Sequence, residues 1–84
     1  MSWAVEWTRT AVKDAKKLDA TIARRVEQAV ARLAEIGEGD VKRLKGMADI
    51  LRLRVGDWRV LFRLEPEAGR LLLLRILHRS DAYR

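Results

Sequence analysis

The chain has few of the residues that form covalent or metal cross-links. Its 84 residues include no cysteine, one histidine and one proline. Without cysteine there are no disulfides or thiolate metal sites, and one histidine does not supply the ligands of a structural zinc site. The longest uninterrupted apolar run, Leu71 to Leu74, is far below the ~18 residues that a membrane span requires. We therefore expect a protein with no metal, no cofactor and no membrane segment.

The beginning of the chain also lacks a targeting pattern. Met1–Glu6 shows no charged region followed by an apolar one, so we expect no secretory signal and a cytoplasmic location. The length fits one domain, residues 1–84. A domain of this size buries only roughly 60–65 % of its unfolded surface. The core is therefore expected to be thin, with stability that depends partly on a partner.

The positive charge is concentrated in the second half. The net charge is +6, yet residues 1–41 carry seven lysines and arginines against seven acids, and residues 42–84 carry eleven against five. Such a bias suggests a polyanionic partner for the second half. A basic surface exposed to water explains the charge alone equally well.

The first half predicts one strand and two helices. Residues 3–7 alternate as a short strand, and Thr8 or Thr10 can cap a helix with apolar positions at Ala11, Ala15 and Leu18. Asp19 offers a second N-cap. The strongly amphipathic helix that follows is expected to end at Gly37 and Gly39. Its apolar positions are Ile22, Val26, Val30 and Leu33.

The second half changes to the period of a strand. Residues 40–49 are expected to form a basic connecting loop, and two alternating segments then flank Gly56-Asp57, a two-residue hairpin turn. After a second turn, residues 70–77 are apolar on both faces, which is typical of a central strand covered on both sides. The predicted order is β-α-α-β-β-β. This is an α+β fold with a helical hairpin on one face of a largely antiparallel four-stranded sheet.

The hairpin predicts where the arginines point. Cross-strand partners share a face, so Arg52, Arg54, Arg59 and Arg63 are expected on the side away from the helices. Like charges placed opposite each other destabilise a sheet, so folding alone gives no reason for Arg54 to face Arg59, whereas a bound polyanion does. Alternatively, the side chains splay into water, bind carbonyls or are neutralised by acids. The expected pairs are Val55–Trp58, Arg54–Arg59, Leu53–Val60 and Arg52–Leu61.

The end of the chain adds groups that transfer protons. His78, Arg79 and Tyr83 follow the last predicted strand and are expected to close one end of the basic face. Cleavage of RNA by its own 2′-hydroxyl needs a base, cations for the phosphorane and an acid for the leaving oxygen. Histidine can serve as acid or base, whereas arginine supplies charge but accepts no proton.

At these residues the chain resembles the RelE/ParE toxin superfamily. The resemblance rests on the hairpin segment at 52–62, on the Leu44-Lys45-Gly46 loop and on the H-R-x-x-x-Y ending at 78–83, which points to the RelE branch. It covers nearly the whole chain and implies a fold like that of microbial ribonucleases. It further implies a toxin that enters the ribosomal A site and cuts mRNA there.

The resemblance also implies partners and site residues. The partners are a RelB-like antitoxin that wraps the toxin, mRNA on the ribosome, and operator DNA reached only through the toxin–antitoxin complex. Trp58 is expected to pack in the core, on the helix side of the sheet. The expected catalytic residues are Arg54, Arg59, His78, Arg79 and Tyr83, and the expected RNA-binding residues are Arg52, Arg43, Lys45 and Arg63.

Two other functions fit the same sequence. One is a ParE-like inhibitor of DNA gyrase, which uses the same fold without nuclease residues. The other is an inactive toxin kept as a binding module, whose arginines hold acidic residues of the antitoxin. The ending at His78, Arg79 and Tyr83 favours the nuclease over both.

Overall fold

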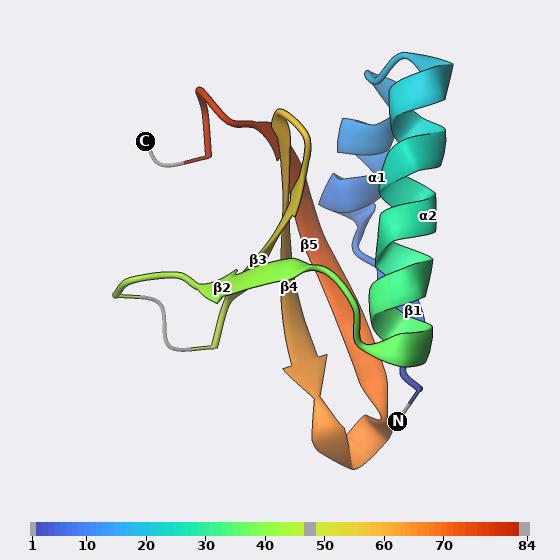
Figure 1. Ribbon diagram of the computed structural model, residues 1–84, viewed down its shortest axis with the longest axis vertical. Helices are drawn as coiled ribbons and strands as arrows, with labels where there is room; N and C mark the ends of the chain where they lie inside the picture. Colours follow the sequence, from blue (N-terminus) through green and yellow to red (C-terminus); the bar gives the residue numbers. More distant parts are fainter. Residues whose placement is uncertain (1, 47–48, 83–84) are drawn as a thin grey trace.

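The computed structural model describes residues 2–46 and 49–82, and in it two helices pack on one face of a single sheet (Figure 1). The strand order is β1-β5-β4-β3-β2, with β1 parallel to β5 and all other pairs antiparallel. None of the helices in this part of the chain is long and apolar enough to cross a membrane. The elements are β1 (Ala4–Trp7), α1 (Arg9–Lys16), α2 (Ala20–Ile36), β2 (Asp40–Arg43), β3 (Leu51–Val55), β4 (Trp58–Glu65), a short 3-10 helix (Pro66–Ala68) and β5 (Arg70–His78).

Both helices begin at the predicted caps. The hydroxyl of Thr8 accepts a hydrogen bond from the amide of Ala11 at 3.1 Å, and a carboxylate oxygen of Asp19 accepts one from the amide of Thr21 at 2.8 Å. These bonds satisfy amides that have no partner inside the helix. The second helix ends at Gly37, whose φ of 71° is left-handed. The predicted starts of both helices and the end of the second at Gly37 are confirmed, whereas the first helix ends at Lys16, before Leu18.

The core lies between the helices and the sheet. Buried apolar side chains of α2 (Val26, Val30 and Ala34) meet those of the strands, and half-buried Trp3, Trp7 and Trp58 pack against them. The helix-side position predicted for Trp58 is confirmed, since it pairs with Val55. The buried strand residues are Leu53, Val60, Phe62, Leu71, Leu73 and Ile76.

The sheet has a fifth strand that the sequence did not reveal. Residues 40–43, expected in a loop, form β2 and pair with β3, with Val41 opposite Leu53. Val41 is the single apolar residue in this strand, too little for alternation to be recognised. The predicted fold class is confirmed, but the prediction of four strands was wrong.

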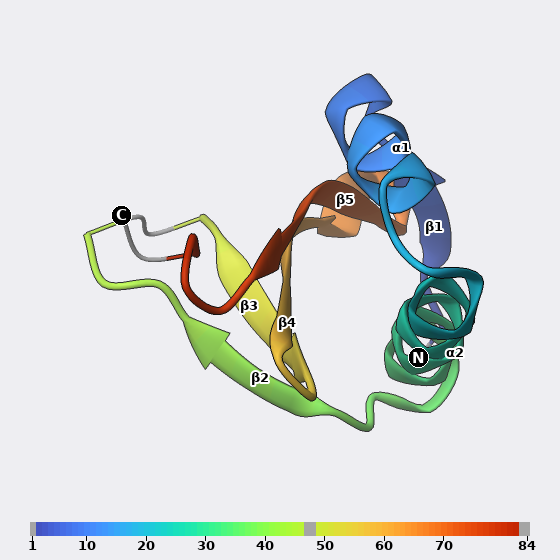
Figure 2. The ribbon, with the colours of Figure 1, turned by 90° about the horizontal axis from the view of Figure 1, so that it is seen from above.

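The expected covering of the last strand on both sides was also wrong. Helices cover one face of β5, where Leu71, Leu73 and Ile76 are buried, while Leu72 and Leu77 on the other face are half-buried. Figure 2 shows both helices on the same side of the sheet. A run of four leucines does not distinguish a strand covered on two faces from one covered on a single face.

A buried carboxylate anchors α1 to the edge of β5. Strand β1 pairs with β5 only from Arg70 to Leu73, so the edge beyond has no neighbouring strand. There Asp14, which is 8 % exposed, accepts hydrogen bonds from the amide of Ile76 at 2.9 Å and from Nε of Arg75 at 2.8 Å. The carboxylate raises the pKa of Arg75 through this hydrogen bond. The helix thus takes the place of a strand at this edge.

Candidate active site

The β3–β4 hairpin has the predicted register. Gly56 and Asp57 form the turn, and Arg54 stands directly opposite Arg59. Gly56 has a φ of 60°, a conformation that glycine adopts without strain. All four cross-strand pairs expected from the sequence are present.

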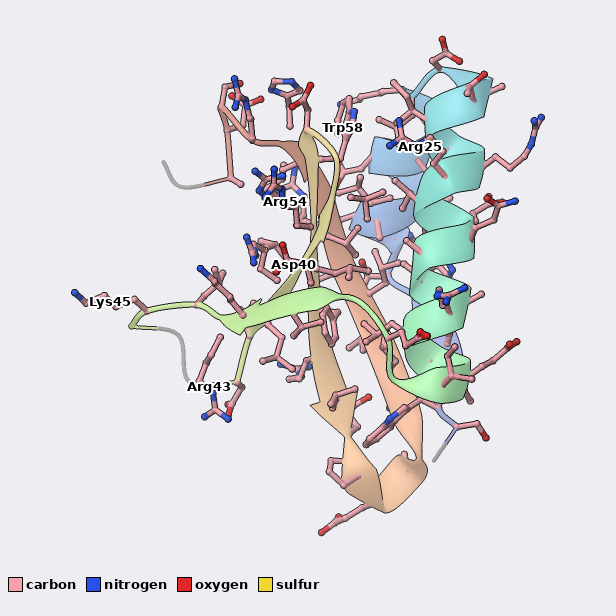
Figure 3. All side chains as sticks on the ribbon, in the orientation of Figure 1. Arg25, Asp40, Arg43, Lys45, Arg54 and Trp58 are labelled. Carbon is pink, nitrogen blue, oxygen red and sulfur yellow. The ribbon has the colours of Figure 1, made fainter. Side chains whose placement is uncertain are left out.

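We call the side of β2, β3 and β4 that is turned away from the helices the open face. Figure 3 shows Arg54 and Asp40 on this side, and Arg25 and Trp58 on the side of the helices. The C-terminal turn and the loop after β2 both project on the open side (Figure 1). The register gives the open face one acid, Asp40, beside the hairpin, and the cations Lys42, Arg52, Arg54, Arg59 and Arg63.

Arg54 is the most accessible of the three arginines near the hairpin. Its side chain is 57 % exposed, and its nearest acid is Asp40, with Nη1 and Oδ2 4.0 Å apart. At that distance and exposure an ion pair contributes little, typically ~0–1 kcal/mol. The guanidinium of Arg54 is therefore accessible to an anion from solution.

Arg52 is buried and paired. It is 7 % exposed, and its Nη2 donates to Oδ1 of Asp40 at 3.3 Å. Its Nε has no hydrogen-bond partner among the described residues. The alternative that an acid neutralises the arginines thus applies at Arg52, because Asp40, which was expected in a loop, lies on a strand beside it.

Arg59 is buried against its own turn. Its Nη1 donates to the carbonyl of Gly56 at 2.8 Å and to the carbonyl of Trp58 at 3.0 Å, and its Nε has no partner among the described residues. Carbonyl oxygens accept hydrogen bonds without cancelling the positive charge. Arg52, Arg54 and Arg59 share the one carboxylate of Asp40, and Arg79 lies near that of Asp57, so these four guanidiniums and two carboxylates leave a net charge of +2.

The last residue of β5, His78, and the residue after it, Arg79, lie on different sides of the sheet. The amide of Arg79 donates to the carbonyl of Asp57 at 2.8 Å, and its Nε lies 3.9 Å from the Asp57 carboxylate, which brings Arg79 to the hairpin. His78 pairs with Trp58, and their rings meet edge to face at 5.3 Å. The ring of His78 therefore lies on the helix side of the sheet. The sequence had led us to expect it beside the arginines, on the other side. Tyr83 lies outside the described residues.

The remaining predicted RNA contacts are spread more widely. Arg63 lies on the open face four residues along β4 from Arg59, whereas the register puts Arg43 on the helix side, opposite Leu51. Figure 3 shows Arg43 pointing away from Arg54, and Lys45 at the far end of the loop. The structure thus groups Arg52, Arg54, Arg59 and Arg79 around the hairpin and leaves Arg43 and Lys45 apart.

At the far end of the open face one arginine is paired with two acids. Arg70 donates to Glu65 at 2.6 Å and to Glu6 at 2.8 Å. Its hydrogen bond to Glu65 lowers the pKa of that carboxyl group. Residues 59 and 65 are ~20 Å apart along the strand at ~3.3 Å per residue. No group of three or more histidine, aspartate or glutamate side chains that could hold a metal occurs in residues 2–46 and 49–82.

The chain and its fold have counterparts among known proteins. Residues 5–83 match the family described as the ParE toxin of type II toxin-antitoxin system, parDE. The chain belongs to this family. The resemblance to the RelE/ParE superfamily is thereby confirmed, and the protein is a toxin of a type II toxin–antitoxin system.

Relatives of this toxin carry names from the RelE branch. Toxin RelG of Mycobacterium tuberculosis is 30 % identical over 93 residues, which cover 100 % of this chain and 99 % of that protein. The toxin–antitoxin complex RelBE2 of the same organism contains a chain with a TM-score of 0.84 and 29 % identity, covering 96 % of this toxin and 95 % of that chain. An archaeal RelE–RelB complex from Pyrococcus horikoshii gives 0.78 and 25 %, covering 98 % and 100 %.

One residue of the candidate site, Asp40, was not predicted from the sequence. Asp40 contacts two of the predicted arginines, yet nothing marked it, because β2 was not recognised. The alternation of Asp40-Val41-Lys42 was the available signal, and it puts Asp40 and Lys42 on one face.

Proposed function

We propose that this toxin is a ribosome-dependent endoribonuclease that cuts mRNA and thereby stops translation. The observation that carries the proposal is the open face itself, where Arg54 stands in register with Arg59 beside a buried Arg52. Two buried Nε atoms without partners among the described residues are a cost to folding. A site that binds phosphate accounts for that cost.

The arginines supply the electrostatic part of this chemistry. An exposed guanidinium at Arg54 fits phosphate oxygens with two parallel hydrogen bonds and is charged at any physiological pH. The positive charge of Arg59 and the guanidinium of Arg79, held at the hairpin, then stabilise the charge that develops on the phosphorane. Cleavage by the neighbouring 2′-hydroxyl needs no metal ion.

A RelB-like antitoxin is the proposed partner. The solved relatives from Mycobacterium tuberculosis and Pyrococcus horikoshii are toxin–antitoxin complexes by name. A segment with acidic residues would neutralise the +2 charge at the hairpin and cover the half-buried Leu61, Leu72 and Leu77, which no helix covers. Bound in this way, the antitoxin would exclude RNA from the open face.

Inducible expression without antitoxin, followed by primer extension on translated transcripts, tests the proposal. We expect growth arrest and discrete cuts with the natural chain, and loss of both in Arg54→Ala, whose side chain contributes little to folding. Arg24→Ala on α2 is the matched control, because Arg24 is exposed and lies outside the sheet. Undiminished cutting by Arg54→Ala would show that the site is elsewhere.

Inhibition of DNA gyrase is the second candidate, and the name of the matching family favours it. A supercoiling assay with purified gyrase and the refolded toxin distinguishes the two. The nuclease proposal predicts unchanged supercoiling at toxin concentrations that stop translation in a cell-free extract. Inhibited gyrase with intact transcripts would replace the first proposal by the second.

A further inference from the structure

Among the described residues, the base that the proposed cleavage requires has to come from a side chain other than arginine or His78. A guanidinium accepts no proton at physiological pH. The ring of His78 lies on the other side of the sheet, against Trp58. Among the described strand residues that share this face with Arg54 and Arg59, Asp40 carries the carboxylate in register with them, whereas that of Asp57 lies in the turn beside Arg79.

Asp40 lies next to the place where the phosphate would bind. It stands opposite Arg54 in the β2–β3 register, as Arg59 does in the β3–β4 register. Neighbouring strands are ~4.8 Å apart, so carboxylate, Arg54 and Arg59 form a row across three strands. A phosphate held by the two arginines would place the ribose that carries the 2′-hydroxyl within reach of one end of the row, where the carboxylate lies.

The carboxylate of Asp40 is also held more loosely than those of Glu65 and Glu38. Its contacts with Arg52 and Arg54 measure 3.3 and 4.0 Å, against 2.6 Å for Glu65 with Arg70 and 3.0 Å for Glu38 with Arg32. Half of its side chain, 52 %, remains exposed. Figure 3 shows Asp40 on the same side of the sheet as Arg54. Oxygen lone pairs therefore remain available to a substrate.

We propose that Asp40 is the general base of the cleavage step, an inference that rests on the proposed endoribonuclease activity. An oxygen of Asp40 takes the proton of the 2′-hydroxyl as the 2′-oxygen forms a bond to phosphorus. The bond from phosphorus to the 5′-oxygen breaks, and that oxygen takes a proton from water or from an acid at the end of the chain. The products are a 2′,3′-cyclic phosphate and a 5′-hydroxyl, and Asp40 returns its proton to water.

Single-turnover cleavage of mRNA on purified ribosomes tests this role. We expect Asp40→Asn to cut at least ~100-fold more slowly, in the range by which general bases act, with ribosome affinity within about threefold of the natural chain. Asp40→Glu keeps the carboxylate and is expected to recover part of the rate. Glu38→Gln is the matched control, because Glu38 lies two residues away, is similarly exposed and also pairs with an arginine.

The dependence of the rate on pH separates a base from a residue that only positions arginines. Asp40 faces Arg52 and Arg54 on β3, and Lys42 lies on the same face of its own strand. We expect the rate of the natural chain to fall as pH is lowered into the range where carboxylates take up protons, and this fall to be absent in Asp40→Asn. If the variant does not fold, the pH profile of the natural chain still tests the proposal.

Three results overturn the inference. One is a cleavage rate of Asp40→Asn within threefold of the natural chain. The second is weaker ribosome binding in that variant with an unchanged pH profile, which would make Asp40 a positioning residue. The third is a natural chain whose rate is flat at acid pH. If instead the natural chain cuts no RNA at all, the proposed function itself has failed.

Discussion

The two faces of the sheet bury different kinds of side chain. On the helix side Leu53, Val60 and Phe62 are buried among apolar neighbours. On the open face, one residue along the same strands, Arg52 and Arg59 are also buried, each with an unpartnered Nε. Burial stabilises the first set through the hydrophobic effect, whereas it removes water from charged groups in the second. The same strands therefore stabilise the fold with the residues on one face and carry the candidate site on the other.

Loss of Asp14 is expected to have the largest effect on stability, because it removes the acid that holds α1 against β5 on the helix side of the sheet. Asp14→Ala leaves the amide of Ile76 without a partner at a buried position. We expect a loss of about 2–4 kcal/mol in the free energy of unfolding, measured by urea titration. Asp14→Asn keeps an acceptor for that amide and should lose less. Equal stability of Asp14→Ala and the natural chain would contradict this account.

Replacement of Arg52 tests whether a buried arginine on the open face contributes to stability. Arg52→Met keeps the aliphatic bulk and removes a buried guanidinium with one hydrogen bond of 3.3 Å. We expect stability to stay constant or to rise by about 1–2 kcal/mol, as when buried ion pairs are replaced by apolar side chains. Activity should fall in the same variant. A large loss of stability would mean that Arg52 serves the fold.

The smallest expected effect on stability concerns Glu65, which pairs with Arg70 at the far end of the open face. Because Arg70 lowers the pKa of Glu65 in the folded state, the pair stabilises the protein above the unfolded pKa of the carboxyl group. This stabilisation is lost as the pH falls through the lower folded value. Glu65→Gln should thus lower Tm slightly at neutral pH and leave it unchanged at strongly acid pH. A constant difference at all pH values would exclude this linkage.

The hairpin could be predicted because its information is local. Strict alternation from Leu51 to Val55 and a glycine at the turn determine both register and faces, so Arg54 and Arg59 were correctly paired. The caps at Thr8 and Asp19 were readable for the same reason. Each of these features depends on residues a few positions apart.

The parts that could not be predicted depend on distant pairings. The acid beside Arg52 comes from β2, which has only Val41 as an apolar signal. The side of the sheet taken by His78 follows from the register of β4 with β5, and an irregularity at Leu61 and Phe62 shifts that register. Alternation within a single strand predicts neither the acid beside Arg52 nor the side on which His78 lies.

The position of β5 has a consequence for the timing of folding. This strand is synthesised after all the others, yet it lies between β1 and β4 and supplies Leu71, Leu73 and Ile76 to the core. A nascent chain that has not reached residue 70 has no partner for β1 and an unfilled space under α1. The sheet and its core can therefore close only once residues 70–78 have been synthesised, which makes the pairing of β1 with β5, from distant parts of the chain, a late step of folding.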